Sequence, residues 1–287
     1  YERISRLLGW FGIENHLNQV TCVDTDLSLN NLGIENEEYS RLCSVVGSVI
    51  HCASDTSFSE SKREKVMAAN INNLNGILEF SKNAHVSFFN YISTAYVAGT
   101  GVTYFKEIIS PAKSFTNVYE ESKATAEKIV SLFCQKNSIN LSIIRPSIVY
   151  GDSQSGRSLK FNALYFPLRS AQSIRDIYLN DLYNNGGIKA VNNGIYIDKD
   201  GYLFLPLKIY LSAEGDLNII PVDYFVNATI KIIENCSQDG IYHLTNKFPT
   251  TMKIVAKYYG QLMKVRGVEI IYSPRPNNAL RNPAEEL

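Results

Sequence analysis

The chain has 287 residues, 45% of them apolar, which is enough for one large domain or for a domain with an attached lobe. Lys plus Arg and Asp plus Glu both total 28, so bulk charge draws the protein neither to nucleic acid nor to an anionic membrane. No apolar run reaches the roughly 18–20 residues of a membrane span, and the histidines and five cysteines lack metal-ligand spacing, so we expect a cytoplasmic protein with free thiols and no metal.

Short apolar segments alternate with amphipathic ones over the first 150 residues. We expect, in chain order, a helix at 3–11, a strand at 20–23, a short helix at 37–43, a strand at 45–50, a helix within 60–82, a strand at 86–92, a long helix at 117–136 and a strand at 141–145. This alternation is typical of a parallel sheet with helices on both faces. The sequence therefore predicts a Rossmann-like, doubly wound α/β fold.

The pattern changes after residue 151. Residues 152–214 are rich in Asn, Asp, Gly and Tyr and have weak periodicity, which indicates a smaller, irregular substrate lobe. Residues 217–226 read as a strand, a turn and the start of a helix, and 241–244 as a last short strand. We expect a nucleotide-binding domain at 1–150 to which 216–235 return, and a lobe formed by 151–215 and 236–287.

The most informative pair is Tyr119 and Lys123, because no other tyrosine of the chain has a lysine four residues later. Positions i and i+4 share a helix face, so both side chains should point at one site. Thr94 ends an upstream strand and adds a hydroxyl. A nearby ammonium favours the phenolate and should lower the tyrosine pKa, so this set fits proton transfer at a carbonyl oxygen during hydride transfer from a nicotinamide. The alternative is a half-buried helix tyrosine and a solvated lysine.

Other candidate residues follow the predicted strands, where parallel sheets bind ligands. Asp26 is suited to accept a hydrogen bond from an adenine amine, or it forms only a turn. His51 ends a strand and is more readily a structural histidine than a proton carrier. Asn70 lies inside a helix and either bonds a backbone carbonyl or water near the site or faces solvent.

A glycine-rich phosphate loop is missing from the sequence, which has no GxGxxG pattern. Dinucleotide-binding folds need that loop to bring the pyrophosphate to a helix N-terminus. We therefore expect the first strand, the glycine loop, the first helix and the second strand to precede Tyr1.

Several motifs occur together in a fixed order between about residues 20 and 245. They are Asp26-Leu27 with Asn31-Leu-Gly-Ile34, His51-Cys-Ala-Ser54, Ile92-Ser-Thr-Ala-Tyr-Val97, Asn117-Val-Tyr-Glu-Glu-Ser-Lys-Ala124, Ile144-Arg-Pro-Ser-Ile-Val149 and Ile220-Pro-Val-Asp-Tyr224. In these motifs the chain resembles the extended short-chain dehydrogenase/reductases, and within them the fatty acyl-CoA reductases and carrier-protein thioester reductases of the male sterility type.

This resemblance implies roles for individual residues. Thr94, Tyr119 and Lys123 would be the catalytic set, and Asp26 and Leu27 would border the adenine. The cofactor would also be lined by Lys123, by Cys52, Ala53 and Ser54, and by Pro146, Ser147, Ile148 and Val149. The implied reaction is reduction of an acyl thioester, on CoA or an acyl carrier protein, to aldehyde or alcohol. We expect NADPH as donor with NAD possible, and homodimers are plausible for this superfamily.

Two other functions remain open at the level of sequence. A nucleotide-sugar epimerase or dehydratase uses the same catalytic set with NAD, and Arg157, Lys160 and Arg169 are candidates to hold a sugar diphosphate. A non-catalytic member that keeps the fold is the third possibility, against which the intact Thr94–Tyr119–Lys123 set argues.

Overall fold

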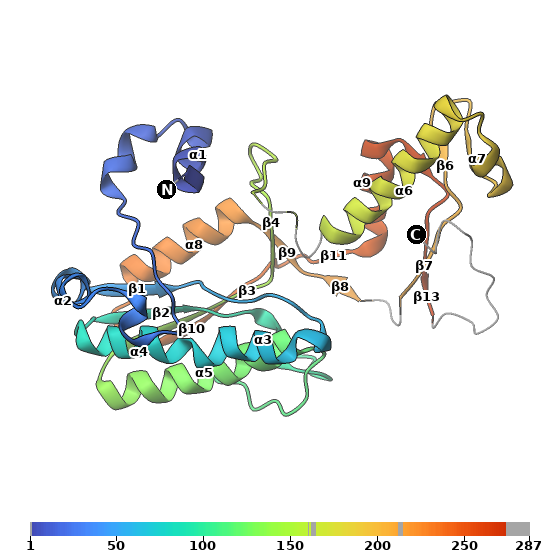
Figure 1. The fold of residues 1–287 in the computed structure, drawn as a ribbon. Helices are drawn as coiled ribbons and strands as arrows, with labels where there is room; N and C mark the ends of the chain where they lie inside the picture. The colour runs from blue at the N-terminus through green and yellow to red at the C-terminus, as the bar shows by residue number, and fades with distance from the viewer. Residues whose placement is uncertain (1, 160, 162–164, 212–214, 274–287) are drawn as a thin grey trace. The chain divides into compact units, whose positions relative to one another are not determined.

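The computed structural model describes residues 2–159, 161, 165–211 and 215–273 (Figure 1). The chain divides into two compact units, Tyr1–Ile144 with Cys236–Tyr242, and Arg145–Asn235 with His243–Leu287. The domain boundaries expected from the sequence stay a prediction. In the structure, the later segment that belongs to the first unit is Cys236–Tyr242. Among the described residues, no helix is both long enough and apolar enough to cross a bilayer.

The first unit alternates helices with strands. Its elements are α1 (Glu2–Phe11), η1 (Glu14–Gln19), η2 (Asn30–Gly33), α2 (Asn36–Val45), β1 (Ser48–His51), η3 (Glu60–Lys62), α3 (Arg63–Met67), η4 (Ala68–Asn72), α4 (Leu74–Asn83), β2 (Phe88–Ile92), η5 (Ala95–Ala98), α5 (Val118–Asn137) and β3 (Asn140–Pro146), with β10 (Gly240–Leu244) from later in the chain. The helices predicted at 3–11, 37–43 and 117–136 and the strands predicted near 86–92, 141–145 and 241–244 are confirmed.

The sheet of this unit has the strand order β1-β2-β3-β10. β1 pairs with β2 in parallel, and β2 pairs with β3 in parallel, with Phe89 opposite Leu141 and Tyr91 opposite Ile143. Because side chains alternate along a strand, these four residues lie on one face of the sheet. The predicted α/β class with a parallel, Rossmann-like sheet is confirmed.

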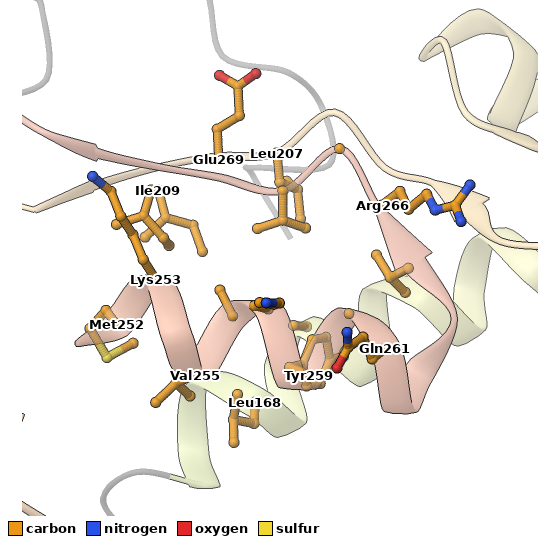
Figure 2. A pocket seen from close by; sticks show the side chains of 18 of the residues that line it. Leu168, Leu207, Ile209, Met252, Lys253, Val255, Tyr259, Gln261, Arg266 and Glu269 are labelled. Atoms are coloured by element: carbon orange, nitrogen blue, oxygen red, sulfur yellow. The ribbon is translucent and has the colours of Figure 1, made fainter. Parts of the chain in front are cut away.

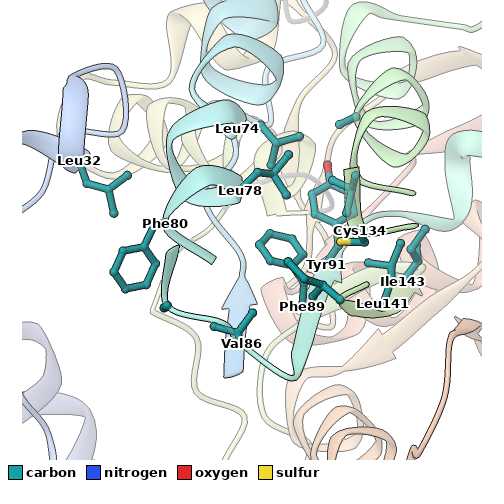
Figure 3. Close-up of a cluster of buried hydrophobic side chains, with 14 residues drawn as sticks. Leu32, Leu74, Leu78, Phe80, Val86, Phe89, Tyr91, Cys134, Leu141 and Ile143 are labelled. Carbon is teal, nitrogen blue, oxygen red and sulfur yellow. The ribbon is translucent and has the colours of Figure 1, made fainter. Parts of the chain in front are cut away.

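Helices α4 and α5 cover that face and form the core with it (Figure 3). Leu74 and Leu78 of α4 and Val130 of α5 are at most 1% exposed, as are Phe89 and Tyr91 of β2. Burying a large apolar side chain fully stabilises the fold by about 1.5–3 kcal/mol. This packing fixes α5 against the C-terminal end of β2, where Thr94 follows.

The helix expected within 60–82 is interrupted. Residues Ala68–Asn72 form a π-helical turn between α3 and α4, and Asn70 within it is only 3% exposed. In a π-helical turn the backbone hydrogen bonds join residues i and i+5, and such turns occur often at functional sites. The turn directs Asn70 inward rather than to solvent.

The strand predicted at 20–23 is wrong. Residues 20–26 carry no regular structure, and β1 pairs only with β2 among the described strands. A strand exists through hydrogen bonds to a neighbour, so β-branched composition alone does not make one. The strand predicted at 45–50 is shifted, because α2 continues to Val45 and β1 begins at Ser48.

The second unit contains α6 (Tyr165–Asn184), α7 (Ile188–Asn192), α8 (Val222–Asn235) and α9 (Met252–Met263). Its strands are β4 (Ile148–Tyr150), β5 (Tyr196–Ile197), β6 (Leu203–Phe204), β7 (Lys208–Leu211), β8 (Asp216–Leu217), β9 (Ile219–Pro221), β11 (Thr250–Thr251), β12 (Val265–Arg266) and β13 (Glu269–Tyr272). The strands are short and lie in small separate sheets.

The 20-residue helix α6 lies in a segment whose sequence shows only weak periodicity. Its apolar side chains Ile174, Tyr178 and Leu182 recur every four residues and pack into a buried cluster with Leu203 and Leu205. The polar residues between them obscure the stripe in the sequence, although the stripe suffices to hold the helix.

Candidate active site

Tyr119 is held in the first turn of α5 by a well-formed helix start. The side chain of Asn117 accepts a hydrogen bond from the Glu120 amide at 3.0 Å. In return the Glu120 carboxylate accepts from the Asn117 side-chain amide and from the Thr116 backbone, both at 3.0 Å. Helix caps of this kind contribute about 1 kcal/mol. They fix the position from which Tyr119 and Lys123 project.

The hydroxyl of Thr94 lies close enough to the Tyr119 phenol to lower its pKa. Thr94 is 5% exposed and caps η5 by accepting a hydrogen bond from the Tyr96 amide at 3.3 Å. Burial raises the pKa of Tyr119 to about 12, the Thr94 hydrogen bond opposes this, and the Glu120 charge adds to it. The expected lowering of the tyrosine pKa by Lys123 is therefore wrong here, because removing the phenolate from water outweighs other influences.

Lys123 is buried, with 2% of its surface exposed. Its Nζ donates a hydrogen bond to the Ile92 carbonyl at 2.6 Å and lies 4.3 Å from the centre of the Tyr91 ring. Burial lowers the pKa of Lys123 to about 8, and Glu127 and Cys52 act in the opposite direction. The alternative of a solvated lysine does not hold, since this ammonium lies inside the unit between β2 and α5.

Asn70 connects the loop after β1 to the start of α5. Its Oδ1 accepts from the Asp55 amide at 2.7 Å and from Ser54 Oγ at 3.1 Å. Its Nδ2 donates to the Asp55 carbonyl at 3.0 Å and to Ser122 Oγ at 2.9 Å, and that hydroxyl donates to the Tyr119 carbonyl. A single amide thus fixes the strand-end loop against the turn that carries Tyr119.

His51 ends β1 and Cys52 follows it, and both are affected by the charge of Lys123. The His51 ring is 7% exposed and stacks on Tyr91 with centroids 5.9 Å apart. Burial, with the Lys123 charge added, lowers the pKa of His51 to about 4, so the ring is neutral at physiological pH. Its structural role stays a prediction. Burial also raises the pKa of the Cys52 thiol, which Lys123 opposes.

A cavity of about 530 Å³ brings together several of the predicted cofactor residues. Asp26 and Leu27 line it with Ala53 and Ser54, although the two pairs are more than twenty residues apart in the sequence. The Asp26 carboxylate also accepts hydrogen bonds from the amide and hydroxyl of Ser28, which lower its pKa. Asp26 therefore both stabilises a turn and lines the cavity.

The loop beside this cavity has an unusual backbone. Asn31, Leu32 and Gly33 all have positive φ, at 50°, 60° and 67°. Left-handed geometry is costly for Leu32, which is nevertheless buried in the core, while Gly33 lines the cavity. The chain therefore accepts local strain where its backbone borders the cavity.

The remaining predicted cofactor residues belong to the second unit. Pro146 ends β3, and β4, which contains Ile148 and Val149, pairs in parallel with β9. Ser147 donates its amide to the Leu244 carbonyl at 3.0 Å, and its buried hydroxyl has no partner among the described residues. The cofactor-binding role of these residues stays a prediction.

Three residues at the site were not singled out from the sequence. Tyr91 supplies the ring under Lys123, Phe58 lies 5.7 Å from the Tyr119 ring, and the fully buried Glu127 acts electrostatically on Lys123. The spacing of Glu127, four residues after Lys123 on α5, was a usable signal. Phe58 belongs to the motif Thr56-Ser-Phe58 that the resemblance includes, but it lies in the irregular segment after β1 and was assigned no role.

The basic residues considered for a sugar diphosphate belong to the second unit or lie outside the described residues. Arg157 lies in the loop after β4, Arg169 is exposed on α6, and Lys160 lies outside the described residues.

The family model of an NAD-binding family, described as male sterility protein, matches residues 1–229. The chain belongs to this family. This membership confirms the resemblance to the extended short-chain dehydrogenase/reductases of the male sterility type that the motifs indicated.

Known proteins and structures add relatives at low identity. The L-2-aminoadipate reductase large subunit of Candida glabrata is 24% identical over 252 residues, covering 81% of this chain but only 17% of that protein. The terminal R domain of the myxalamid PKS-NRPS pathway matches with a TM-score of 0.68 and 21% identity, covering 94% of this chain and 61% of that one. UDP-glucuronic acid 4-epimerase from Bacillus cereus in complex with NAD matches with a TM-score of 0.60 and 16% identity, covering 84% and 66%.

Proposed function

We propose that this protein reduces an acyl thioester, carried on CoA or on the phosphopantetheine arm of a carrier protein, to an aldehyde or alcohol. NADPH is the preferred donor, and NAD is the alternative. The observation that carries the proposal is Tyr119 beside Thr94, with the buried Lys123 one turn further along the same helix. Thr94 follows a strand end and the other two residues come from α5, so two elements supply the three groups.

The protonation state of Tyr119 fits reduction. With a pKa near 12 the phenol keeps its proton at neutral pH. When hydride adds to a thioester carbonyl, negative charge develops on the oxygen, and a neutral phenol is the form that donates to it. Thr94 lies beside the phenol, and in this proposal its hydroxyl orients the same oxygen.

The residues present fit a nicotinamide dinucleotide. The cavity lined by Asp26, Leu27, Ala53 and Ser54 also contains Asp24, so it offers carboxylates that could accept from an adenine amine beside small apolar neighbours. Lys123 carries three N–H donors, of which Ile92 takes one, so others remain for ribose hydroxyls. The bound dinucleotide would supply the hydride, and the chain's own groups orient the acceptor and provide the proton.

The relatives support a thioester substrate. The R domain belongs to a PKS-NRPS pathway, and the chain spans 17% of the aminoadipate reductase that it matches.

All five cysteines are free in the structure, which accords with a cytoplasmic location. The homodimer expected from the sequence stays a prediction.

The test is consumption of NADPH by the purified protein with dodecanoyl-CoA, with NADH and a UDP-sugar in parallel reactions. We expect oxidation that depends on the thioester and yields dodecanal or dodecanol. Turnover of the UDP-sugar without thioester reduction would replace the proposal by an epimerase or dehydratase. If no substrate, including an acylated carrier protein, is turned over, the result would favour a non-catalytic member of the family.

A further inference from the structure

Phe58 is an aromatic side chain beside the candidate proton donor that the proposed reaction does not use. Its ring centre lies 5.7 Å from that of Tyr119, with the ring planes tilted by 39°. Phe58 is nevertheless 56% exposed and belongs to the irregular segment after β1. Functional side chains are often carried on loops that a rigid scaffold positions. An exposed ring held against this phenol therefore indicates a task beyond packing of the core.

The loop that carries Phe58 is fixed by hydrogen bonds. The Asp55 carboxylate accepts from the amide two residues later at 2.9 Å, which forms a turn just before Phe58. Asn70 holds the Asp55 amide at 2.7 Å and its carbonyl at 3.0 Å. The same Asn70 donates to Ser122 Oγ of α5 at 2.9 Å. Both aromatic rings are therefore attached to one network, and their separation does not depend on a bound ligand.

The other large space in the molecule contains none of these groups. A cavity of about 720 Å³ lies between α9 and the parallel pair β7–β13 (Figure 2). The residues that line it all belong to the second unit. The surroundings of the Tyr119 phenol are therefore described from the residues of the first unit.

The titratable groups near the phenol come from α5, β2 and the loop. On α5 the Glu120 charge raises the pKa of Tyr119, and Lys123 lies one turn further along. On β2, Tyr91 interacts electrostatically with Tyr119, and Asp55 is the carboxylate of the loop. Burial is the largest influence and raises the pKa of Tyr119 to about 12. What keeps water from the phenol therefore matters more for it than any single charge.

We propose that Phe58 is a positioning residue whose ring shields the Tyr119 phenol from water. The consequence for turnover rests on the proposed function, in which this phenol donates the proton. Water beside a reacting group weakens the electrostatic interactions that stabilise developing charge. The shielding itself is a property of the first unit and exists without cofactor or substrate.

The experiment measures how readily solvent reaches the phenol. N-acetylimidazole acetylates accessible tyrosine hydroxyls, and trypsin releases residues 114–123, in which Tyr119 is the only tyrosine. Peptide mass spectrometry gives the rate at Tyr119 and at two internal references. Tyr104 is 78% exposed and reports the reagent, and Tyr91 is 1% exposed and reports the fold. Phe58→Ala removes the ring, and Phe11→Ala is the matched control because Phe11 is 57% exposed.

We expect acetylation of Tyr119 to be several-fold faster in Phe58→Ala than in the parent protein, with Tyr91 and Tyr104 unchanged. Phe11→Ala should react as the parent does, and Phe58→Leu, which keeps apolar bulk, should restore most of the protection. An unchanged rate at Tyr119 in Phe58→Ala overturns the proposal. A rise at Tyr91 as large as that at Tyr119 also overturns it, because the whole unit would then have opened.

Turnover gives the second measurement. Phe58→Ala should lower kcat for thioester reduction by about tenfold with a smaller change in KM, since admitted water weakens stabilisation of the developing oxyanion. Phe58→Leu should recover most of that kcat. A parental kcat in Phe58→Ala overturns the positioning role even where acetylation rises.

The two measurements separate this inference from the proposed function. Acetylation needs neither cofactor nor substrate, so faster acetylation of Phe58→Ala in a protein that reduces no thioester would keep the shielding and reject the reaction. Thioester reduction by the parent protein, with equal acetylation of Tyr119 in parent and Phe58→Ala, would keep the reaction and reject the shielding.

Discussion

The ammonium of Lys123 donates a 2.6 Å hydrogen bond to the carbonyl of Ile92, the last residue of β2. This bond joins the middle of α5 directly to the strand end that leads to Thr94. The lysine is therefore a fixed part of the site, and its position does not depend on a bound ligand. Because charge is buried here, the catalytic set should be unusually sensitive to pH.

Tyr119→Phe tests the proton donor. Loss of the phenol should lower kcat for thioester reduction by about 10²–10⁴-fold, the usual contribution of a positioned acid. Stability should fall by only about 1 kcal/mol, since one hydrogen bond to Thr94 is lost. Stopped-flow NADPH oxidation and urea unfolding measure the two effects. Tyr104→Phe, at a position that is 78% exposed, is the matched control, and equal rates in both variants would remove Tyr119 from the mechanism.

Lys123→Met tests the buried charge. Because the folded-state pKa is about 8, below the ordinary lysine value of 10.5, the unfolded chain binds more protons between these pH values. The free energy of unfolding should therefore rise with pH in that window, by about 3 kcal/mol in total, relative to Lys123→Met. Urea titrations at pH 7 to 10 measure the difference.

Turnover should show the opposite trend. If the charged form of Lys123 is needed, the rate of the parent protein declines as pH rises through about 8. Lys128→Met, at an exposed position of the same helix, should keep both the parent rate and its pH profile. A parent protein whose stability follows that of Lys123→Met across the window would show that the lysine is not buried in solution.

Asn70→Ala tests the link between the β1 loop and α5. The change leaves the Asp55 amide and the Ser122 hydroxyl without their partner, so we expect a loss of about 1–3 kcal/mol in unfolding free energy. Turnover should also fall, because the turn that carries Tyr119 is no longer fixed. Asn72→Ala alters the exposed neighbour in the same helical turn and should be nearly neutral. Equal unfolding midpoints for the two variants would contradict the role assigned to Asn70.

Gly33→Ala tests the strained loop at the cavity of Asp26. Its φ of 67° disfavours any side chain, and the new methyl would meet Leu29 at 3.3 Å, so about 1 kcal/mol of stability should be lost. NADPH affinity, measured by fluorescence titration, should fall as the loop shifts. Gly12→Ala has the same backbone strain with no neighbour within 4 Å, and its NADPH affinity should stay that of the parent.

The sequence predicted the elements that are stabilised by their own residues. The α5 helix follows from its cap Asn117 and its apolar stripe, and β2 from its run of aromatic residues. The strand at 20–23 failed because strand formation depends on a partner that local composition does not specify. The helix α6 was missed because polar residues interrupt its four-residue repeat.

The same distinction between local sequence and packed surroundings applies to the candidate site. The spacing of Tyr119 and Lys123 showed that they share a helix face, and both point into the first unit. The spacing did not show that burial would raise the pKa of one and lower that of the other, because desolvation depends on the packed surroundings. Partners distant in sequence, such as Asn70 and Ser122, are visible only once the chain is folded.

The π-helical turn at Ala68–Asn72 sets the register of everything that follows it in the helix. An α-helix turns about 100° per residue, so deletion of one residue from this turn would rotate α4 by that angle relative to α3. Leu74 and Leu78 would leave the sheet, and Asn70 would no longer face Ser122. The length of this segment is therefore as tightly constrained as its composition, and homologues that keep the Asn70 contacts should tolerate substitutions here but not single-residue insertions or deletions.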